Sequence, residues 1–266
     1  MKIITMATLK GGAGKTVNLF NIAGILAEKK TVLLIDVDPQ CNLSNDCRID
    51  VTDRNGYSVK DIFDNTPAKQ PDAGDLIVKA PIPDLKKLDI IPSSILLFKT
   101  EQKIASRGDN THILERYIER NRKVFDSYDY VLIDTNPSMS LVNINAFYVA
   151  DSIILSTDVS NNGISGVELF CALWDEKREE LEKEDNIEAL IIGNNDRRSR
   201  LGKELYEFAS EAGFSQDLLV KTVIPQSKKI KDTEMKHTPI NILYPSDDIT
   251  QVYRDIVDEL KKGGTL

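Results

Sequence analysis

A glycine-rich stretch, KGGAGKT at residues 10–16, narrows the possible folds of this chain more than any other feature. The segment before it, residues 2–9, has the apolar composition of a buried strand. The segment after it, residues 18–28, carries leucine, isoleucine and alanine at the spacing of one helix face. A strand, a glycine loop and a helix in this order bring phosphate groups to the N-terminus of the helix. The three segments therefore predict a phosphate-binding loop within an α/β fold.

The residue types in this loop suit a nucleotide phosphate and a metal ion. Gly11, Gly12 and Gly14 lack a Cβ, so the backbone can turn sharply and direct successive N–H groups at phosphate oxygens. Lys15 adds a positive charge, and the hydroxyl of Thr16 can bind Mg²⁺. We expect the nucleotide to contact the whole loop, which comprises Lys10, Gly11, Gly12, Ala13, Gly14, Lys15, Thr16 and Val17.

Lys10 makes this loop unusual. An ordinary loop of the form G-x-x-x-x-G-K-[ST] needs only the lysine that Lys15 provides. Here a further lysine, Lys10, directly precedes the glycine pair. The sequence thus places a second lysine beside the predicted phosphate site.

Short apolar runs alternate with helical patterns along the chain. We predict further strands at residues 31–36, 87–92, 130–134, 152–157, 188–193 and 219–225. Further helices are predicted at residues 94–106, 112–125, 142–149, 165–184, 202–212 and 249–261. Nearly continuous apolar strands joined by helices indicate a mostly parallel, twisted sheet with helices on both faces. Residues 50–87 are irregular, and we expect them to form a decorated surface segment.

Composition fits one enzyme-sized globular domain. The 266 residues are 41% hydrophobic and 29% charged, and no apolar run approaches the length of a membrane-spanning helix. The first residues are too quickly polar for a signal peptide, so we expect a cytoplasmic protein. The net charge of −8 argues against a globally basic nucleic-acid-binding protein, although a local basic patch could still bind. The three cysteines have no metal-like spacing, and two histidines offer little for a metal site.

Two acidic motifs suggest that the bound nucleotide is hydrolysed. Asp36 and Asp38 lie in DVDPQCN at the end of the second predicted strand, where ligand-binding residues of open α/β sheets collect. Asp38 could orient an attacking water. Asp134 ends another strand in YVLIDTNPS and has the position of a Walker B aspartate, which holds Mg²⁺ through water. Asp36 could hold the metal through water as well.

Taken together, KGGAGKT, DVDPQCN and YVLIDTNPS resemble, in order and spacing, the ParA/MinD group of deviant Walker A ATPases. Within that group the chain looks most like the ParA (Soj-like) plasmid and chromosome partition ATPases. The similarity runs through most of the chain and includes LDIIPSS at residues 88–94 and the segment at residues 223–240. It implies a single P-loop ATPase domain over residues 1–266, without a separate N-terminal helix-turn-helix domain.

The resemblance also implies a catalytic cycle. ATP and Mg²⁺ are the expected nucleotide and metal, held in a homodimer that encloses two nucleotides. Lys10 matches the lysine that reaches the partner's nucleotide, so we expect it to act in catalysis with Lys15 and Asp38. Pro225 and Ser227 match positions near the nucleotide base.

Three positions depart from the pattern of the group. Val17 replaces a threonine, Asn136 stands where proline is common, and Gln226 takes the place of a frequent arginine. None of them removes a catalytic group, but the last two could change the coupling of the switch or the affinity for DNA.

Two basic stretches are candidates for binding DNA without reading its sequence. In the resembling group, basic residues in these regions contact DNA phosphates. They are Arg197, Arg198, Arg200 and Lys203 in the first stretch, and Lys228, Lys229 and Lys231 in the second. The resemblance further implies a ParB-like centromere-binding partner that stimulates hydrolysis, and association with the nucleoid in the ATP state.

Several alternatives stay open. A MinD-like positioning ATPase would use the same site on a membrane, but the helix predicted at residues 249–261 has an acidic outer face, so we expect no stable membrane association. A redox member of the same fold would need paired cysteines near a dimer axis, which Cys41 and Cys47 do not match. A module that binds ATP without appreciable hydrolysis is a further alternative, and Asp38 argues against it.

Overall fold

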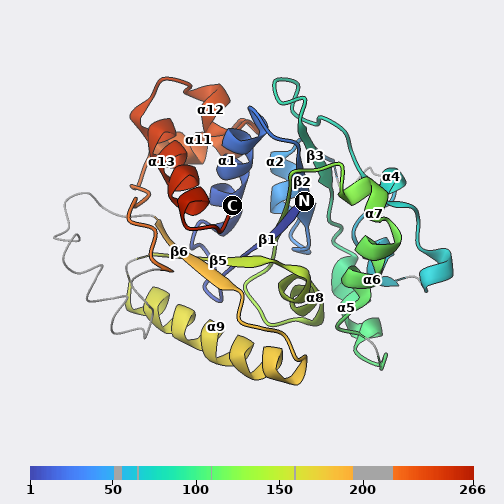
Figure 1. Cartoon of the computed structure of the whole chain (residues 1–266). Helices are drawn as coiled ribbons and strands as arrows, with labels where there is room; N and C mark the ends of the chain where they lie inside the picture. Colours follow the sequence, from blue (N-terminus) through green and yellow to red (C-terminus); the bar gives the residue numbers. More distant parts are fainter. Residues whose placement is uncertain (51–55, 65, 109, 159, 194–217) are drawn as a thin grey trace.

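Six of the predicted apolar runs form one parallel sheet, in the order β3-β2-β4-β1-β5-β6 (Figure 1). The computed structural model describes residues 1–50, 56–64, 66–108, 110–158, 160–193 and 218–266. The strands are β1 (Lys2–Ala7), β2 (Val32–Asp36), β3 (Leu88–Ile91), β4 (Tyr130–Asp134), β5 (Ser152–Asp158) and β6 (Ile187–Gly193). The central strand β1 pairs with β4 and β5, and every pairing is parallel. The predicted fold class is therefore confirmed.

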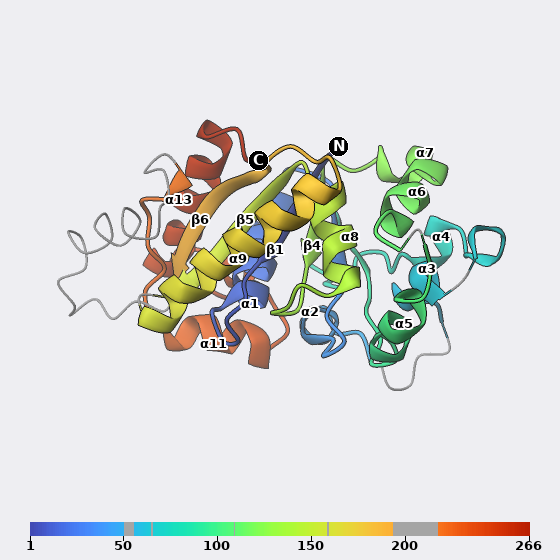
Figure 2. The same cartoon turned by 90° about the horizontal axis from the view of Figure 1, so that it is seen from below.

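Helices cover both faces of the sheet (Figures 1 and 2). One face carries α1 (Lys15–Ala27), α2 (Asn42–Asp46), α11 (Lys228–Met235), α12 (Ile240–Leu243) and α13 (Asp248–Lys262). The other face carries α5 (Leu97–Ile104), α6 (Ile113–Arg120), α7 (Arg122–Phe125), α8 (Leu141–Val149) and α9 (Asn161–Glu180). Between β2 and β3 the chain also forms α3 (Lys60–Asp64), the 3₁₀ turn η1 (Pro67–Lys69) and α4 (Ala73–Leu76).

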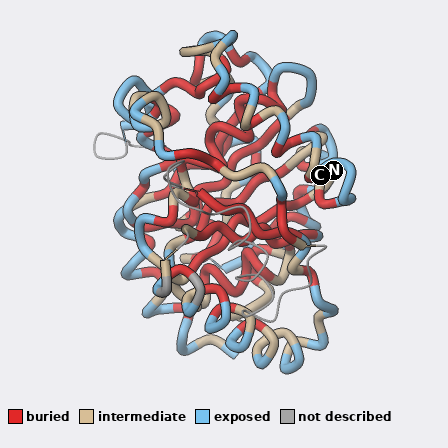
Figure 3. The backbone as a smooth tube through the Cα atoms, turned by 90° about the vertical axis from the view of Figure 1, so that its left-hand side faces the viewer, coloured by how far each residue is buried: buried red, intermediate tan, exposed pale blue. Residues whose placement is uncertain are grey.

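The core lies on both sides of the sheet because side chains alternate along each strand. Ile4 and Met6 of β1 pack with α1 and α13, whereas Ile3 packs with the helices of the opposite face. Leu33 and Leu34 divide in the same way in β2, and neither is exposed. Figure 3 shows this buried layer through the middle of the molecule. Burial on both faces explains why the strand sequences are almost wholly apolar.

The predicted strand at residues 219–225 is wrong. Leu219 makes an isolated parallel bridge to β6, and the N–H groups of Val220 and Ile224 donate to the carbonyls of Leu190 and Ile192, at 3.1 and 2.9 Å. The N–H groups of Lys221 and Thr222 donate instead to the carboxylate of Glu259 in α13, at 2.7 and 3.1 Å. A side chain from a distant helix thus takes the donors that a continuing ladder would need.

The segment at residues 50–87 is more than surface decoration. Within its described part, Ile62, Phe63 and Leu76 are completely buried and join the core on the α5 and α6 side. These apolar residues lie in the short helices α3 and α4, which are too short to produce a long periodic pattern in the sequence. The prediction of a surface segment is corrected accordingly.

The last helix packs on its own domain, as its apolar spacing predicted. Ile249, Tyr253, Ile256 and Leu260 of α13 are at most 4% exposed, and the cluster that they join includes α1. The Tyr253 hydroxyl donates to Asn18 Oδ1 of α1 at 2.9 Å. In the described part of the chain, no helix has the length and apolar character to cross a membrane.

Candidate functional site

The glycine loop joins β1 to α1 and takes backbone conformations that L side chains rarely adopt. Gly12 and Gly14 have φ angles of 79° and 75°, and Gly14 is the N-cap residue of α1. A Cβ on Gly14 would also lie 3.3 Å from the Asn18 amide. Gly11 is different, because its φ is not positive and a Cβ there meets no atom within 4 Å. The turn itself therefore requires glycine at positions 12 and 14.

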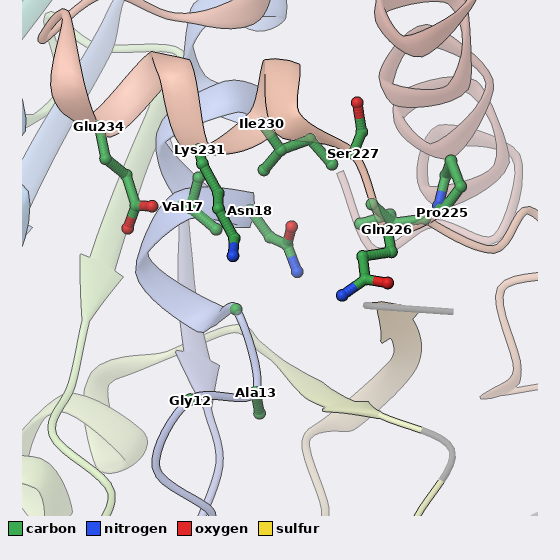
Figure 4. A pocket seen from close by; sticks show the side chains of 12 residues that line it. Gly12, Ala13, Val17, Asn18, Pro225, Gln226, Ser227, Ile230, Lys231 and Glu234 are labelled. Carbon is green, nitrogen blue, oxygen red and sulfur yellow. The ribbon is translucent and has the colours of Figure 1, made fainter. Parts of the chain in front are cut away.

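Two adjoining cavities open around this loop. The first, here called the loop cavity, has a volume of about 320 Å³ and is lined by Thr8, residues 10–17, Asp38, Gln40, Asn42, Pro137 and Glu234. The second, here called the α11 cavity, has about 360 Å³ and is lined by residues 12–14, Val17, Asn18, residues 224–227, Ile230, Lys231 and Glu234 (Figure 4). The predicted loop residues thus lie in the wall of the loop cavity, with Pro225 and Ser227 in the wall of the α11 cavity.

Lys15, Thr16 and Asp134 meet at the inner end of the loop cavity. Lys15 Nζ lies 2.5 Å from Asp134 Oδ1, and the Thr16 hydroxyl donates to Asp134 Oδ2 at 2.8 Å. Lys15 is 6% exposed and Asp134 is fully buried. Parallel pairing of β1 with β4 brings these residues together, because Met6 lies opposite Asp134 and the loop starts four residues later, at Lys10. Walker A and Walker B candidates, far apart in sequence, are therefore in direct contact.

Asp36 and Asp38 have separate structural roles. Both oxygens of Asp36 accept hydrogen bonds from its own chain: Oδ1 from the N–H of Asp38 at 3.0 Å, and Oδ2 from the N–H and hydroxyl of Ser44 at 2.9 and 2.7 Å. Asp36 thereby ties the end of β2 to α2. Asp38 is 5% exposed and lines the loop cavity, where its Oδ1 accepts from the N–H of Gln40 at 2.9 Å. Of these two aspartates, Asp38 is therefore the one that lines the loop cavity.

Burial and mutual repulsion favour the neutral form of several carboxyl groups in this region. Burial, together with the charge of Asp134, raises the pKa of Asp36 to about 7. Burial also raises the pKa of Asp134 above its usual range despite the opposing effect of Lys15. Nearby in α2, burial and the charge of Glu234 raise the pKa of Asp46 to about 8. A cation in the cavity would relieve this repulsion.

Lys10 is held by the end of β5 in the same chain. Its Nζ donates to Asp158 Oδ1 and Oδ2 at 2.6 and 2.5 Å and to Ser160 Oγ at 2.8 Å. Ser160 is also the N-cap of α9 and accepts from the N–H of Gly163. Burial raises the pKa of Asp158, but the hydrogen bonds from Lys10 and Ser160 outweigh it and hold that pKa below its usual value. Lys10 thus lies in the wall of the loop cavity, bound to an ionised carboxylate.

The second basic stretch is divided among different surroundings. Lys228 is exposed and has no ion pair among the described residues. Lys229 forms an ion pair with Asp247 and lies 5.5 Å from the ring centre of Tyr244. Lys231 lines the α11 cavity instead. The first stretch, with Arg197, Arg198, Arg200 and Lys203, lies outside the described residues.

Sequence reasoning missed several residues around the site. Asp158 and Ser160 hold Lys10, Asn18 lines the α11 cavity, and Glu234 lines both cavities. Asp158 has a signal that could have found it, because it ends a buried strand just as Asp36 and Asp134 do. Glu234 has none, because its place depends on how α11 packs.

Asn136, which departs from the expected proline, also has a structural role. The Asn143 side-chain amide of α8 donates to the Asn136 carbonyl at 2.9 Å and to its Oδ1 at 2.7 Å. The Ser138 hydroxyl donates to the same Oδ1. A polar network therefore shapes the turn after β4, next to Pro137 in the wall of the loop cavity.

Comparisons with known proteins bear on the fold and the family of this chain. The model of the family described as "AAA domain" matches residues 1–188. The sporulation initiation inhibitor protein Soj of Bacillus subtilis is 29% identical over 264 residues, covering 99% of both chains. Two solved structures share the fold. Apo McdA of Cyanothece has a TM-score of 0.82 at 20% identity, covering 98% of this chain and 99% of McdA. A putative plasmid partition protein of Borrelia burgdorferi bound to AMPPNP has a TM-score of 0.78 at 22% identity, covering 98% of each chain.

Proposed function

Because the chain belongs to the AAA domain family, and within it to the ParA/MinD-like group of P-loop ATPases, we propose that it is a DNA partition ATPase. In this proposal two copies dimerise around ATP and Mg²⁺, bind DNA without sequence preference, and hydrolyse ATP when a ParB-like centromere-binding protein stimulates them. One observation carries the proposal. A second lysine, Lys10, lies in the wall of the loop cavity, beside a complete phosphate-binding loop. Hydrolysis by a single chain has no need of that lysine.

ATP and Mg²⁺ fit the residues present. Among the described residues, no group of three His, Cys, Asp or Glu side chains forms a metal site of its own. Mg²⁺ at a nucleotide needs less, because it usually binds one or two protein groups together with phosphates and water. The Thr16 hydroxyl and the Asp134 carboxylate, 2.8 Å apart, would hold it. When bound, the metal neutralises negative charge on the phosphates.

The side chains around the loop cavity support hydrolysis. Backbone N–H groups of the loop and the Lys15 ammonium would bind the phosphates at the N-terminus of α1. Asp38 would orient water, because its carboxylate lines the same cavity and its position is fixed by Asp36 and Gln40. Asp36 acts on this reaction through Asp38 and α2, since both of its oxygens are already engaged.

Dimerisation would bring Lys10 to the second nucleotide. Within one chain, Asp158 and Ser160 hold the Lys10 ammonium. A phosphate carries more negative charge than Asp158, so a nucleotide presented by a second copy would compete for this lysine. Hydrolysis that depends on Lys10 would then depend on the dimer.

Binding to DNA is supported by the exposed Lys228 and by the basic character of residues 197–203 in the sequence. We place the protein in the cytoplasm and, with ATP bound, on the nucleoid. No observation favours a MinD-like membrane cycle, because α13 buries its apolar side chains against its own domain.

ATP turnover tests this function. The wild type should hydrolyse ATP and should retain duplex DNA only with ATP and Mg²⁺ present. Asp38→Ala should reduce turnover by a factor of about 100 while keeping nucleotide binding, because it removes the group that orients water. Asp84→Ala, which changes an exposed aspartate outside both cavities, is the matched control and should leave turnover unchanged.

The proposed binding to DNA has its own control variant. Lys228→Glu should weaken DNA retention, whereas Lys86→Glu, at another exposed lysine, should not. Equal turnover in wild type and Asp38→Ala would remove the catalytic assignment. DNA retention that is the same with and without ATP would overturn the proposed coupling between ATP binding and DNA binding.

A further inference from the structure

Glu234 has an unusual place between the two cavities. The loop cavity and the α11 cavity share five lining residues: Gly12, Ala13, Gly14, Val17 and Glu234. Of these five, only Glu234 has a side chain that can make hydrogen bonds. A nucleotide that places its phosphates in the loop cavity and its base in the α11 cavity must place its ribose at their junction. The one polar side chain at that junction therefore faces the sugar.

We propose that Glu234 recognises the ribose of the bound nucleotide by accepting hydrogen bonds from its 2′- and 3′-hydroxyl groups. The inference rests on the nucleotide site proposed above. An ionised carboxylate has two acceptor oxygens, and two vicinal hydroxyls offer two donors, so the groups match in number and polarity. Figure 4 shows Glu234 and Lys231 extending from α11 toward the side of the glycine loop.

The carboxylate is free for this role. Its oxygens make no hydrogen bond or ion pair with any residue that the structure describes. Burial raises the pKa of Glu234, and the positive charge of Lys231, one turn earlier in α11, opposes that rise. The charge of Glu234 in turn helps to raise the pKa of Asp46 in α2, so the two carboxyl groups lie near each other. An exposed carboxylate without a hydrogen-bond partner among the described residues is well placed to accept hydrogen bonds from a neutral ligand.

The helix that carries Glu234 is firmly placed. α11 begins at the Ser227 N-cap, whose hydroxyl accepts from the N–H of Lys229. It contacts α1, α2 and α12. Lys231 and Glu234 are three residues apart and so lie on the same face of this helix. The packing of α11 on α1 thus determines where the carboxylate stands relative to the glycine loop.

Binding of three nucleotides tests the inference. Calorimetric titration with Mg²⁺ and ADP, 2′-deoxy-ADP or 3′-deoxy-ADP avoids hydrolysis during the measurement. The wild type should bind ADP about tenfold more tightly than either deoxy nucleotide. Glu234→Ala should bind all three nucleotides about equally, because it loses two hydrogen bonds to ADP and the one that remains to each deoxy nucleotide. Glu234→Gln, which keeps one acceptor oxygen, should be intermediate.

The controls separate this inference from the proposed function. Glu176→Gln, at an exposed glutamate of α9 outside both cavities, should bind all three nucleotides as the wild type does. If the wild type binds ADP and both deoxy nucleotides equally, or if Glu234→Ala changes all three affinities by the same factor, the ribose assignment is wrong while the nucleotide site stands. If the wild type binds none of them, the proposed function itself fails. Thermal unfolding of each variant shows whether the fold is retained.

Discussion

At the scale of single residues, the site depends on which partner each charged group has. Lys10 pairs with Asp158 and Lys15 pairs with Asp134, whereas Asp38 lines the loop cavity and forms no ion pair with any described residue. Both lysines would have to exchange these carboxylates for phosphate oxygens when a nucleotide binds. The ion pairs are therefore the groups that a nucleotide and a second copy would compete with.

Asp46 should make the free protein less stable as the pH rises. Burial and the charges of Glu234, Asp134 and Asp36 raise its pKa from 3.8 to about 8, so the folded state keeps a proton that the unfolded chain has lost. Between about pH 4 and pH 8 the folded state then binds more protons, and the free energy of unfolding falls with rising pH. Asp46→Asn should remove about 3 kcal/mol of this decline, as measured by urea unfolding at pH 5, 6.5 and 8. An unchanged slope would show that Asp46 is ionised in the folded protein.

At the scale of secondary structure, the sequence predicts those elements whose structure follows from a local pattern of residues. Each strand of the sheet is a run of apolar residues, and α13 has apolar residues at helical spacing and Asp247 as N-cap. Other elements depend on distant contacts. The helix predicted at residues 112–125 breaks at Asn121, whose side chain accepts a hydrogen bond from the N–H of Ala73 at 3.0 Å. No local sequence pattern predicts such a hydrogen bond.

The same distinction between local patterns and distant contacts explains which site residues can be predicted from the sequence. The loop, Asp38 and Asp134 lie in contiguous motifs, so their chemistry can be predicted from spacing. Lys231 was predicted to contact DNA, and it lines the α11 cavity because the position of its helix is determined by packing on α1 and α2. Lys10 and Asp158 are 148 positions apart in the sequence, and they meet because β1 and β5 pair in parallel.

Gly24 should be essential to the contact between α1 and α12. A Cβ at this position would lie 2.5 Å from Pro239 Cβ and 2.6 Å from Asn241 Oδ1, closer than atoms can approach. The Asn241 amide also donates to the Gly24 carbonyl at 3.0 Å, so the two segments cannot simply separate. Gly24→Ala should lower the free energy of unfolding by about 3 kcal/mol, although alanine favours helices. Gly74→Ala, where a Cβ meets nothing within 4 Å, is the control. Equal stability of the two variants would contradict this packing.

At the scale of the whole molecule, the strand order brings the motifs to one edge of the sheet. β1 lies between β4 and β5, and β2 lies beside β4. The glycine loop, Asp38, Asp134 and Asp158 all follow or end these parallel strands, so they gather at the carboxyl edge where α/β proteins bind ligands. Lys10 lies at this edge as well, where a second copy bound face to face could reach it.

Mixing two inactive variants tests most directly the claim that Lys10 acts on the nucleotide of the partner. Lys10→Ala keeps Asp38 but cannot supply the lysine, and Asp38→Ala keeps the lysine but cannot orient water. Each should bind nucleotide and hydrolyse almost none. In a mixed dimer, the nucleotide of the Lys10→Ala copy receives Asp38 from its own chain and Lys10 from the other. ATP turnover of an equal mixture should therefore recover to about a quarter of the wild-type rate, because half of the dimers are mixed and each has one complete site. A mixture as inactive as its components, or normal turnover by Lys10→Ala alone, would contradict the account.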